Sequence, residues 1–163
     1  MKSTFCGISS KVLLKVAKET FEMKLIEKQQ DLFTVNLDEW IPVHCISMDC
    51  KMSAGIAVTM RKRFNLGEMA HHPPEELTPP TCLFFNGVMN LITKKKYWQK
   101  PTYESLKTAL LCLKNLCNDH QITKIVMPRI GSGLDRLSWS KVRQILKEMF
   151  QDTEIIIQIC YLK

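Results

Sequence analysis

Strand-like and helix-like patterns alternate through the second half of the chain, and this order restricts the possible folds more than any other feature. The predicted elements are a helix over 102–118, a strand over 122–127, a helix over 138–150 and a strand over 154–161. Ser138 or Ser140 is the predicted N-cap of the second helix. Such alternation predicts an α/β fold with three layers, α/β/α, around a central mixed sheet.

The middle of the chain contains one strong local signal, a hairpin. Two apolar runs, 81–85 and 88–93, flank the dipeptide Asn86-Gly87. Asn-Gly favours a type I′ turn because both turn residues need a positive φ. The remaining predicted elements are helices over 9–20 and 54–64, strands over 22–28 and 41–46, and a long Pro-rich loop over 71–80.

Length and cysteine content restrict the class of protein. The 163 residues fit one domain, and no apolar run approaches the roughly 20 residues of a membrane span. The N-terminus has no clear secretory signal. Seven cysteines occur without any C-x-x-C pair, which favours free thiols in a reducing compartment. We therefore expect a cytoplasmic and/or nuclear protein without membrane partners, and no metal site, because zinc-ligand spacing is missing.

The net charge of +7 indicates an anionic partner but does not identify it. Nucleic acid, a phosphorylated small molecule and an acidic protein all fit. The densest basic runs, 61–63 and 94–96, are short, and a solvated surface is the ordinary interpretation of such runs. Trp40, Trp98 and Trp139 are far apart in the sequence, whereas a base-stacking platform interleaves aromatic and basic residues. Nucleic-acid binding is therefore the least favoured interpretation.

The stretch 127–137 is the most informative motif for a ligand. A buried strand runs into Gly131-Ser132-Gly133 and then into a helix. In open α/β sheets ligands bind beyond the carboxyl ends of the strands, and glycines let backbone N–H groups approach a phosphate. A plain turn explains a G-x-G sequence equally well, so the motif alone leaves phosphate binding open.

Two further stretches share this strand-to-loop character. In 45–57 a strand ends in small residues that lead into a helix, which suits close approach to a ligand or tight helix packing. In 91–94 a strand delivers Lys94 at its end, followed by Lys95 and Lys96. An exposed lysine is the ordinary interpretation, but positive neighbours favour the neutral, nucleophilic form of an amine.

Six blocks of the sequence, in this order, resemble one family. They are Asp31-Leu-Phe33, His44-Cys-Ile-Ser47, Met52-Ser-Ala-Gly-Ile-Ala57, Leu91-Ile-Thr-Lys-Lys95, Lys100-Pro-Thr-Tyr-Glu104 and Met127-Pro-Arg-Ile-Gly-x-Gly-Leu-Asp-Arg-Leu137. On these blocks the chain resembles the macrodomain family, and within it the terminal ADP-ribose protein glycohydrolase and O-acyl-ADP-ribose deacylase branch. The resemblance covers 22–163 and leaves 1–21 as an N-terminal extension, either a helix or a disordered arm.

The resemblance implies a catalytic function. The lysine and aspartate that set this branch apart are present as Lys94 and Asp135. The protein would bind ADP-ribose, remove mono-ADP-ribose from glutamate and aspartate side chains, and deacylate O-acyl-ADP-ribose without a cofactor. Lys94 would attack the anomeric carbon, and Asp135 would donate and accept protons. The implied partners are ADP-ribose and mono-ADP-ribosylated proteins, and we expect a monomer.

The resemblance also implies the binding residues. Asp31 and Leu32 would read the adenine, and Ser47 and Thr93 would line the distal-ribose pocket. Two segments would hold the phosphates and the distal ribose: Ser53, Ala54, Gly55, Ile56 and Ala57, and Ile130, Gly131, Ser132, Gly133 and Leu134. Gln30 and Ser53 replace glycines that are usual in the family, and a Cβ at Ser53 narrows the space for the ligand. The alternative is therefore a non-catalytic reader of ADP-ribosylated proteins.

Overall fold

The computed structural model describes residues 23–71 and 78–163. The helix predicted over 9–20, the extension at 1–21 and the middle of the Pro-rich loop lie outside these residues. Within the described part of the chain, no helix is both long enough and apolar enough to cross a lipid bilayer.

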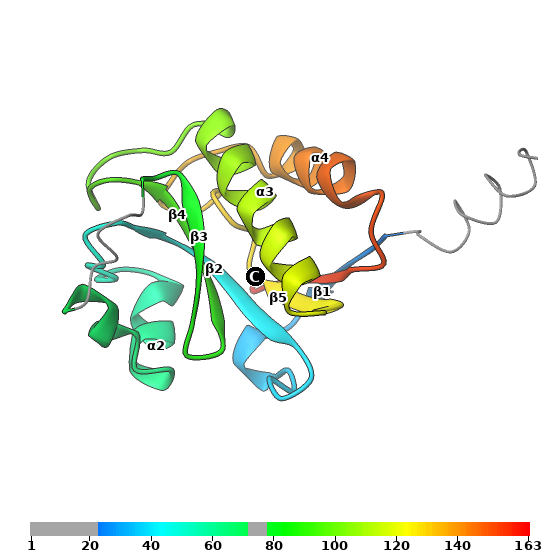
Figure 1. Cartoon of the computed structure of the whole chain (residues 1–163), viewed down its shortest axis with the longest axis horizontal. Coiled ribbons are helices and arrows are strands. Elements are labelled where there is room, and N and C mark those ends of the chain that lie inside the picture. Colours follow the sequence, from blue (N-terminus) through cyan, green and yellow to red (C-terminus); the bar gives the residue numbers. More distant parts are fainter. Residues whose placement is uncertain (1–22, 72–77) are drawn as a thin grey trace, which may run out of the picture.

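A six-stranded mixed sheet forms the centre of the molecule (Figure 1). Its strands in chain order are β1 (Lys24–Gln29), β2 (Ile41–Ser47), β3 (Thr81–Phe85), β4 (Val88–Lys94), β5 (Lys124–Met127) and β6 (Ile156–Tyr161). They lie in the order β1-β6-β5-β2-β4-β3, and every neighbouring pair is parallel except β3 with β4. Ile125, Val126 and Met127 are buried, as expected for a central parallel strand covered on both faces.

The β3–β4 hairpin at the edge of the sheet turns where the sequence predicts. Phe85 pairs with Val88, which leaves two residues in the turn. Asn86 has a φ of 46° and Gly87 a φ of 75°. Positive φ at both positions is the requirement of a type I′ turn, and this turn fixes the register of the two strands.

Helices cover both faces of the sheet (Figure 1). α3 (Tyr103–Asp119) and α4 (Trp139–Phe150) pack on one face, and α2 (Ile56–Arg63) lies on the other. Two 3-10 helices, η1 (Leu32–Thr34) and η2 (Leu66–Ala70), contribute their buried residues to the core on the α2 side. The arrangement confirms the predicted three-layer α/β/α fold with a mixed sheet.

Backbone geometry sets the starts of two helices. The helix predicted over 54–64 begins at Ile56, because Gly55 before it has a φ of 61° and a non-helical ψ. Ser138 and Ser140 are both candidate N-caps of α4 in the sequence, and the helix begins directly after Ser138. The Ser138 hydroxyl makes no capping bond and instead lies 3.0 Å from the Ser140 hydroxyl.

α3 is bounded by local hydrogen bonds at both ends. At its N-terminus, Thr102 and Ser105 form a capping box in which each side chain accepts from the backbone N–H of the other. At its C-terminus, the N–H of Ile122 donates to the carbonyl of Cys117 at 2.8 Å. This bond belongs to the helix ending, so β5 starts at Lys124 and is shorter than predicted.

A buried polar pair lies between two central strands. His44 on β2 stands opposite Asn90 on β4, and His44 Nε2 is 2.7 Å from Asn90 Oδ1. The Asn90 amide also donates to the carbonyls of Leu83 and Val88. Burial lowers the pKa of His44 to about 4, although its hydrogen bond with Asn90 acts in the opposite direction. The imidazole is therefore neutral at physiological pH.

Candidate functional site

Three adjacent parallel strands end at one edge of the sheet, and the loops that follow them enclose a pocket. β5, β2 and β4 are neighbours and run in the same direction, so their carboxyl ends lie side by side. The pocket has a volume of about 440 Å³. It is lined by 45–47 and 52–57, by Lys94, Tyr97 and Lys100, and by 128–131 and 133–135. Ligands of open α/β sheets bind at this position.

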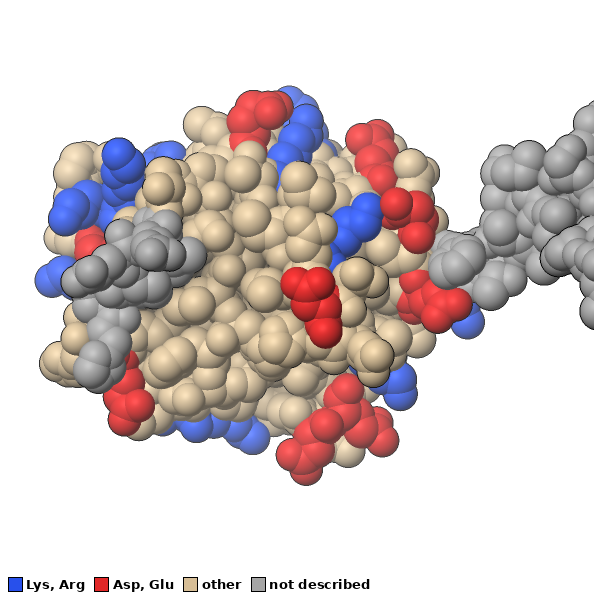
Figure 2. Space-filling view, in the orientation of Figure 1, with Lys and Arg blue, Asp and Glu red and all other residues tan. Residues whose placement is uncertain are grey.

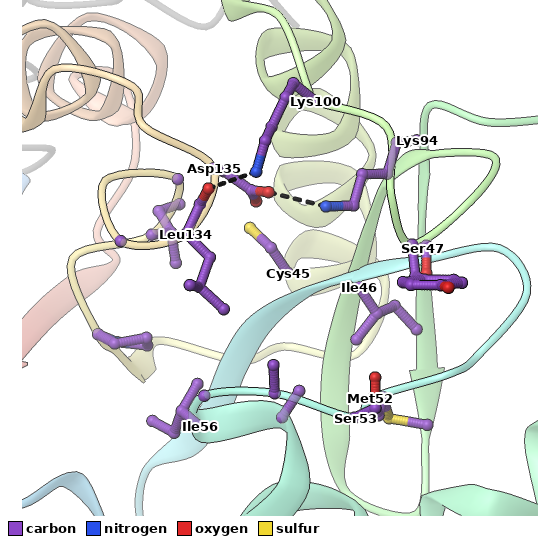
Figure 3. A pocket seen from close by; sticks show the side chains of 18 of the residues that line it. Cys45, Ile46, Ser47, Met52, Ser53, Ile56, Lys94, Lys100, Leu134 and Asp135 are labelled. Carbon is purple, nitrogen blue, oxygen red and sulfur yellow. Dashed lines mark hydrogen bonds and ion pairs between the residues drawn. The ribbon is translucent and has the colours of Figure 1, made fainter.

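The centre of the pocket holds an ion pair. Lys94 is the last residue of β4, and Asp135 lies in the loop that follows β5. Their side chains point toward each other across the pocket (Figure 3), with Lys94 Nζ 2.7 Å from Asp135 Oδ1. The two side chains are only 13% and 15% exposed, so water screens the pair weakly. A proton can pass directly between the amine and the carboxylate at this distance.

Cys45 forms part of the pocket beside this pair (Figure 3). Burial, together with the negative charge of Asp135, raises the pKa of the Cys45 thiol to about 12. The thiol is therefore protonated at physiological pH, and thiolate is the nucleophilic form of cysteine. Lys94, in contrast, has the carboxylate of Asp135 at 2.7 Å as a proton acceptor, which favours the amine as the nucleophile.

The glycine loop after β5 is a tight turn held by its own backbone. Gly131 has a φ of 71°, and its carbonyl accepts from the N–H of Leu137 at 2.7 Å. A Cβ at Gly131 would lie only 3.0 Å from the Leu137 side chain. At Gly133, by contrast, a Cβ would meet nothing within 4 Å. The open space beside Gly133 belongs to the pocket.

The segment before α2 faces the glycine loop from the opposite wall. Gly55 has a φ of 61°, and a Cβ at this position would lie 3.8 Å from Leu134 of the facing loop. Ser53 and Ala54 are exposed toward the pocket, and Ile56 begins α2. The first N–H groups of a helix have no intrahelical acceptor, so this end of α2 favours an anion in the pocket.

Two further residues close the end of the pocket near the ion pair. Lys100 Nζ donates to the carbonyl of Leu134 at 2.6 Å and so bridges the loops that follow β4 and β5 (Figure 3). The backbone N–H of Tyr97 donates to Asp49 Oδ2 at 3.1 Å, and the hydroxyl of Ser47 donates to Asp49 Oδ1. These contacts tie the loop after β4 to the loop after β2.

Comparison with known proteins identifies the fold family. A family model described as Macro domain matches residues 50–146. The chain belongs to the macrodomain family. It is 42% identical over 119 residues to ADP-ribose glycohydrolase OARD1 of Bos taurus, covering 72% of this chain and 78% of the relative. The Homo sapiens protein of the same name is 41% identical over 118 residues, covering 71% of this chain and 78% of the relative. Among solved structures, the macrodomain of Mycobacterium tuberculosis DarG matches this chain with a TM-score of 0.72 at 20% sequence identity. The match covers 85% of this chain and 98% of that chain, and it supports the fold assignment.

The pocket of this macrodomain brings together most of the residues that the sequence analysis singled out. Lys94 and Asp135 form the central pair. The other predicted residues that line the pocket are Ser47, Ser53, Ala54, Gly55, Ile56, Ala57, Ile130, Gly131, Gly133 and Leu134. The two motifs that were ambiguous alone, the glycine loop and the small-residue segment, therefore face each other across one pocket.

Two predicted residues lie near the pocket without lining it. Thr93 is buried at an irregularity in the pairing of β2 with β4, where Ser47 pairs with Lys94 and Thr93 has no partner on β2. Its Oγ1 has no hydrogen-bond partner within the described residues. The Ser132 hydroxyl donates to the carbonyl of Arg129 at 2.6 Å and stabilises the loop itself.

The predicted adenine-reading residues lie at a distance from this pocket along the same sheet edge. Asp31 caps η1, where its carboxylate accepts from the N–H of Phe33 at 3.0 Å, and Leu32 is buried. Both follow β1, which is separated from β2 by β6 and β5. Arg129 connects the two regions, because it lines the pocket and its guanidinium lies 3.9 Å from the ring centroid of Tyr161 at the end of β6.

Several residues that line the pocket have no role in the site predicted from the sequence. They are Cys45, Ile46, Met52, Tyr97, Lys100, Pro128 and Arg129. All except Tyr97 fall inside blocks that carried the resemblance, so their presence near the site had a signal. For Tyr97 no local signal existed, because its position depends on how the loop after β4 folds back toward Asp49.

The distribution of surface charge bears on nucleic-acid binding, and the positions of the His, Cys, Asp and Glu side chains bear on metal binding. On the face drawn in Figure 2, lysines and arginines occur in small separate groups with acidic residues between them, and no continuous basic stripe crosses that face. Nucleic-acid backbones favour such a stripe. Within residues 23–71 and 78–163, no group of three or more His, Cys, Asp or Glu side chains could hold a metal ion.

Proposed function

We propose that this macrodomain binds ADP-ribose, hydrolyses mono-ADP-ribose from glutamate and aspartate side chains, and deacylates O-acyl-ADP-ribose. Two relatives at 42% and 41% identity are named as ADP-ribose glycohydrolases, which supports hydrolysis of an ADP-ribosyl bond. The observation that carries the proposal is the 2.7 Å pair of Lys94 and Asp135 inside the pocket. A non-catalytic reader has no need of a weakly exposed amine and carboxylate in direct contact.

The proposed ligand lies along the sheet edge. The diphosphate would sit between the segment 53–57 and the glycine loop, where free N–H groups at the start of α2 favour an anion. The distal ribose would lie toward Lys94 on β4, and the adenine toward Asp31 beyond β1. Four strand spacings of ~4.8 Å separate β1 from β4, or roughly 19 Å, which suits an extended dinucleotide-like ligand.

The proposed reaction uses Lys94 and Asp135 in turn. Asp135 first accepts a proton from the Lys94 ammonium, which leaves a neutral amine. The amine attacks the anomeric carbon, the C–O bond to the protein carboxylate breaks, and the carboxylate leaves with the bonding electrons. Protonated Asp135 returns its proton to the leaving group and then takes one from the new secondary ammonium.

The second half of the reaction releases the sugar from the lysine. Asp135 protonates the amine nitrogen and then accepts a proton from water, whose oxygen attacks the anomeric carbon. The C–N bond breaks, free ADP-ribose leaves, and the proton held by Asp135 restores the Lys94 ammonium. Water supplies an OH to the sugar and a proton that restores the Lys94 ammonium. The proton that Lys94 first gave up has passed through Asp135 to the released carboxylate, so the steps balance.

Removal of the lysine separates the enzyme from the reader. Lys94→Ala should stop release of ADP-ribose from glutamate-modified protein and leave the affinity for free ADP-ribose within a few fold, because the amine acts on the anomeric carbon. Release is followed by chromatography and affinity by calorimetry. Lys62→Ala, an exposed lysine on α2 outside the pocket lining, is the matched control and should retain full activity. Full hydrolysis by Lys94→Ala would refute the mechanism and leave the fold assignment intact.

Removal of the aspartate should trap the intermediate. In Asp135→Ala the Lys94 ammonium loses its proton to solvent instead, so the amine still attacks, but the group that resolves the adduct is gone. Intact-mass spectrometry after incubation with ADP-ribose should therefore show a covalent adduct on Asp135→Ala and none on the double variant that also carries Lys94→Ala. An adduct that persists without Lys94 would show that another lysine had reacted.

A further inference from the structure

The pocket mouth next to the ion pair carries an unusual group of exposed side chains. Six large hydrophobic side chains are exposed in the described residues, and three of them belong to the two loops beside Lys94. Tyr97 is 52% exposed and Trp98 is 67% exposed on the loop after β4, and Leu134 is 65% exposed on the facing loop. Tyr97 and Leu134 also line the pocket itself. Exposed apolar side chains on the two loops that flank one opening indicate a contact surface.

The loop that carries the two aromatic residues is held in place before any partner arrives. Asp49 accepts from the Tyr97 N–H, and its own N–H donates to the carbonyl of Lys95 at 3.3 Å. Gln99 accepts from the N–H of Lys96 at 2.9 Å and donates its own N–H to the Lys96 carbonyl. Such preorganisation lowers the entropy cost of binding.

The same loop is strongly basic. Lys95 and Lys96 are exposed, and Lys51 lies over the Tyr97 ring at 5.4 Å from the ring centroid. The nearby acid, Asp49, already accepts hydrogen bonds from Ser47 and the Tyr97 backbone. The other carboxylate at this end of the pocket, Asp135, is paired with Lys94. Three exposed lysines, Lys51, Lys95 and Lys96, stand against the carboxylate of Asp49, so the net charge of this group is positive.

We propose that the surface formed by Lys95, Lys96, Tyr97, Trp98 and Leu134 binds an acidic polypeptide segment that flanks the ADP-ribosylated residue of the substrate protein. This inference rests on the proposed function. A protein cannot enter a cavity of about 440 Å³, so the chain that bears the ADP-ribosyl group stays at the mouth beside the reacting carbon. There it meets lysines that attract carboxylates and aromatic side chains that contact its apolar parts.

The experiment compares two short peptides, each with one ADP-ribosylated glutamate. Aspartates and glutamates flank the modified residue in one peptide, and serines and glycines flank it in the other. The full chain should show a kcat/KM about three- to tenfold higher for the acidic peptide, through a lower KM, because two surface lysines add modest attraction each. Added salt should reduce this ratio by screening the exposed charges.

Charge variants test whether the mouth itself makes the selection. The double variant Lys95→Ser with Lys96→Ser should bring the ratio of the two kcat/KM values close to one. The control, Lys62→Ser with Lys147→Ser, loses the same charge from exposed positions outside the pocket lining and should keep the ratio of the unmodified chain. Trp98→Ser should raise KM for both peptides. Binding of free ADP-ribose, which does not contact the flanking segment, checks that each variant is folded.

The outcomes separate this inference from the proposed function. Equal kcat/KM for both peptides with the unmodified chain, or an equal loss of selectivity in both double variants, would overturn the inference and leave the hydrolase standing. Release from neither peptide by a chain that still binds ADP-ribose would overturn the proposed hydrolase, and this inference with it.

Discussion

The buried imidazole of His44 makes the stability of the fold depend on pH in a defined window. Burial is the main cause of its low pKa, which falls from 6.5 to about 4 in the folded chain. The unfolded chain therefore binds a proton at this residue as the pH falls below about 6.5, whereas the folded chain does so only near pH ~4. Because the unfolded state takes up the proton first, the free energy of unfolding decreases as the pH falls through this window.

The magnitude follows from the size of the shift. A shift from 6.5 to about 4 corresponds to about 3 kcal/mol when the window is crossed completely. Between about pH 7.5 and about pH 5 the same linkage gives a loss of about 2 kcal/mol. This is a large fraction of the 5–15 kcal/mol or so that stabilises a typical domain.

Urea unfolding at the two pH values measures the effect, with His44→Gln as the comparison because glutamine does not titrate. The variant has a different stability at both pH values, so the test is the difference between the two proteins in their pH dependence. The unmodified chain should lose about 2 kcal/mol more than the variant between about pH 7.5 and about pH 5. Equal losses would show that His44 titrates normally and would refute the assignment of a buried neutral imidazole.

Three further predictions concern the glycine loop and the start of α3. Gly133→Glu should abolish ADP-ribose binding in calorimetry while the melting temperature is kept, because the space beside Gly133 is open and the new carboxylate repels the diphosphate; Gly131→Ala should instead lower stability by ~1–2 kcal/mol, because Gly131 has a positive φ and its Cβ would meet Leu137 at 3.0 Å. Unchanged affinity in folded Gly133→Glu would place the diphosphate elsewhere. Thr102→Ala should cost about 1 kcal/mol in urea unfolding by removing the capping bond to Ser105, and no loss would show that the box contributes nothing.

The elements with local signals could be predicted from the sequence alone. The Asn86-Gly87 turn has positive φ at both residues, as the local preference of this dipeptide predicts. Five apolar residues of 102–118 recur at helical spacing in the sequence, and all five are buried in α3: Leu106, Ala109, Leu110, Leu113 and Cys117. Element ends were less accurate, because backbone geometry such as the positive φ of Gly55 has no periodic signal.

The central pair could not be predicted from spacing. Lys94 and Asp135 are 41 residues apart, and they meet only because β4, β2 and β5 lie side by side and run in parallel. That strand order depends on long-range packing, which a pattern within one segment does not contain. The resemblance to the family does imply the pair, because a family motif preserves the outcome of packing as well as the local preferences.

The loop after β4 has an ordinary basic composition, and its place beside the pocket is what suggests a function for it. As sequence, Lys94, Lys95 and Lys96 indicate a solvated basic surface, and Trp98 is an isolated aromatic residue. The parallel strand delivers Lys94 to the pocket, and the loop that follows returns to the pocket at Tyr97, where Asp49 holds it by accepting from the Tyr97 N–H. From the sequence, these lysines are compatible with nucleic acid, a metabolite or an acidic protein as the partner. In the proposed complex they lie beside one reacting carbon. For that reason we expect the selectivity of this loop to be for the substrate protein, and the affinity for ADP-ribose itself to depend on the glycine loop and the start of α2.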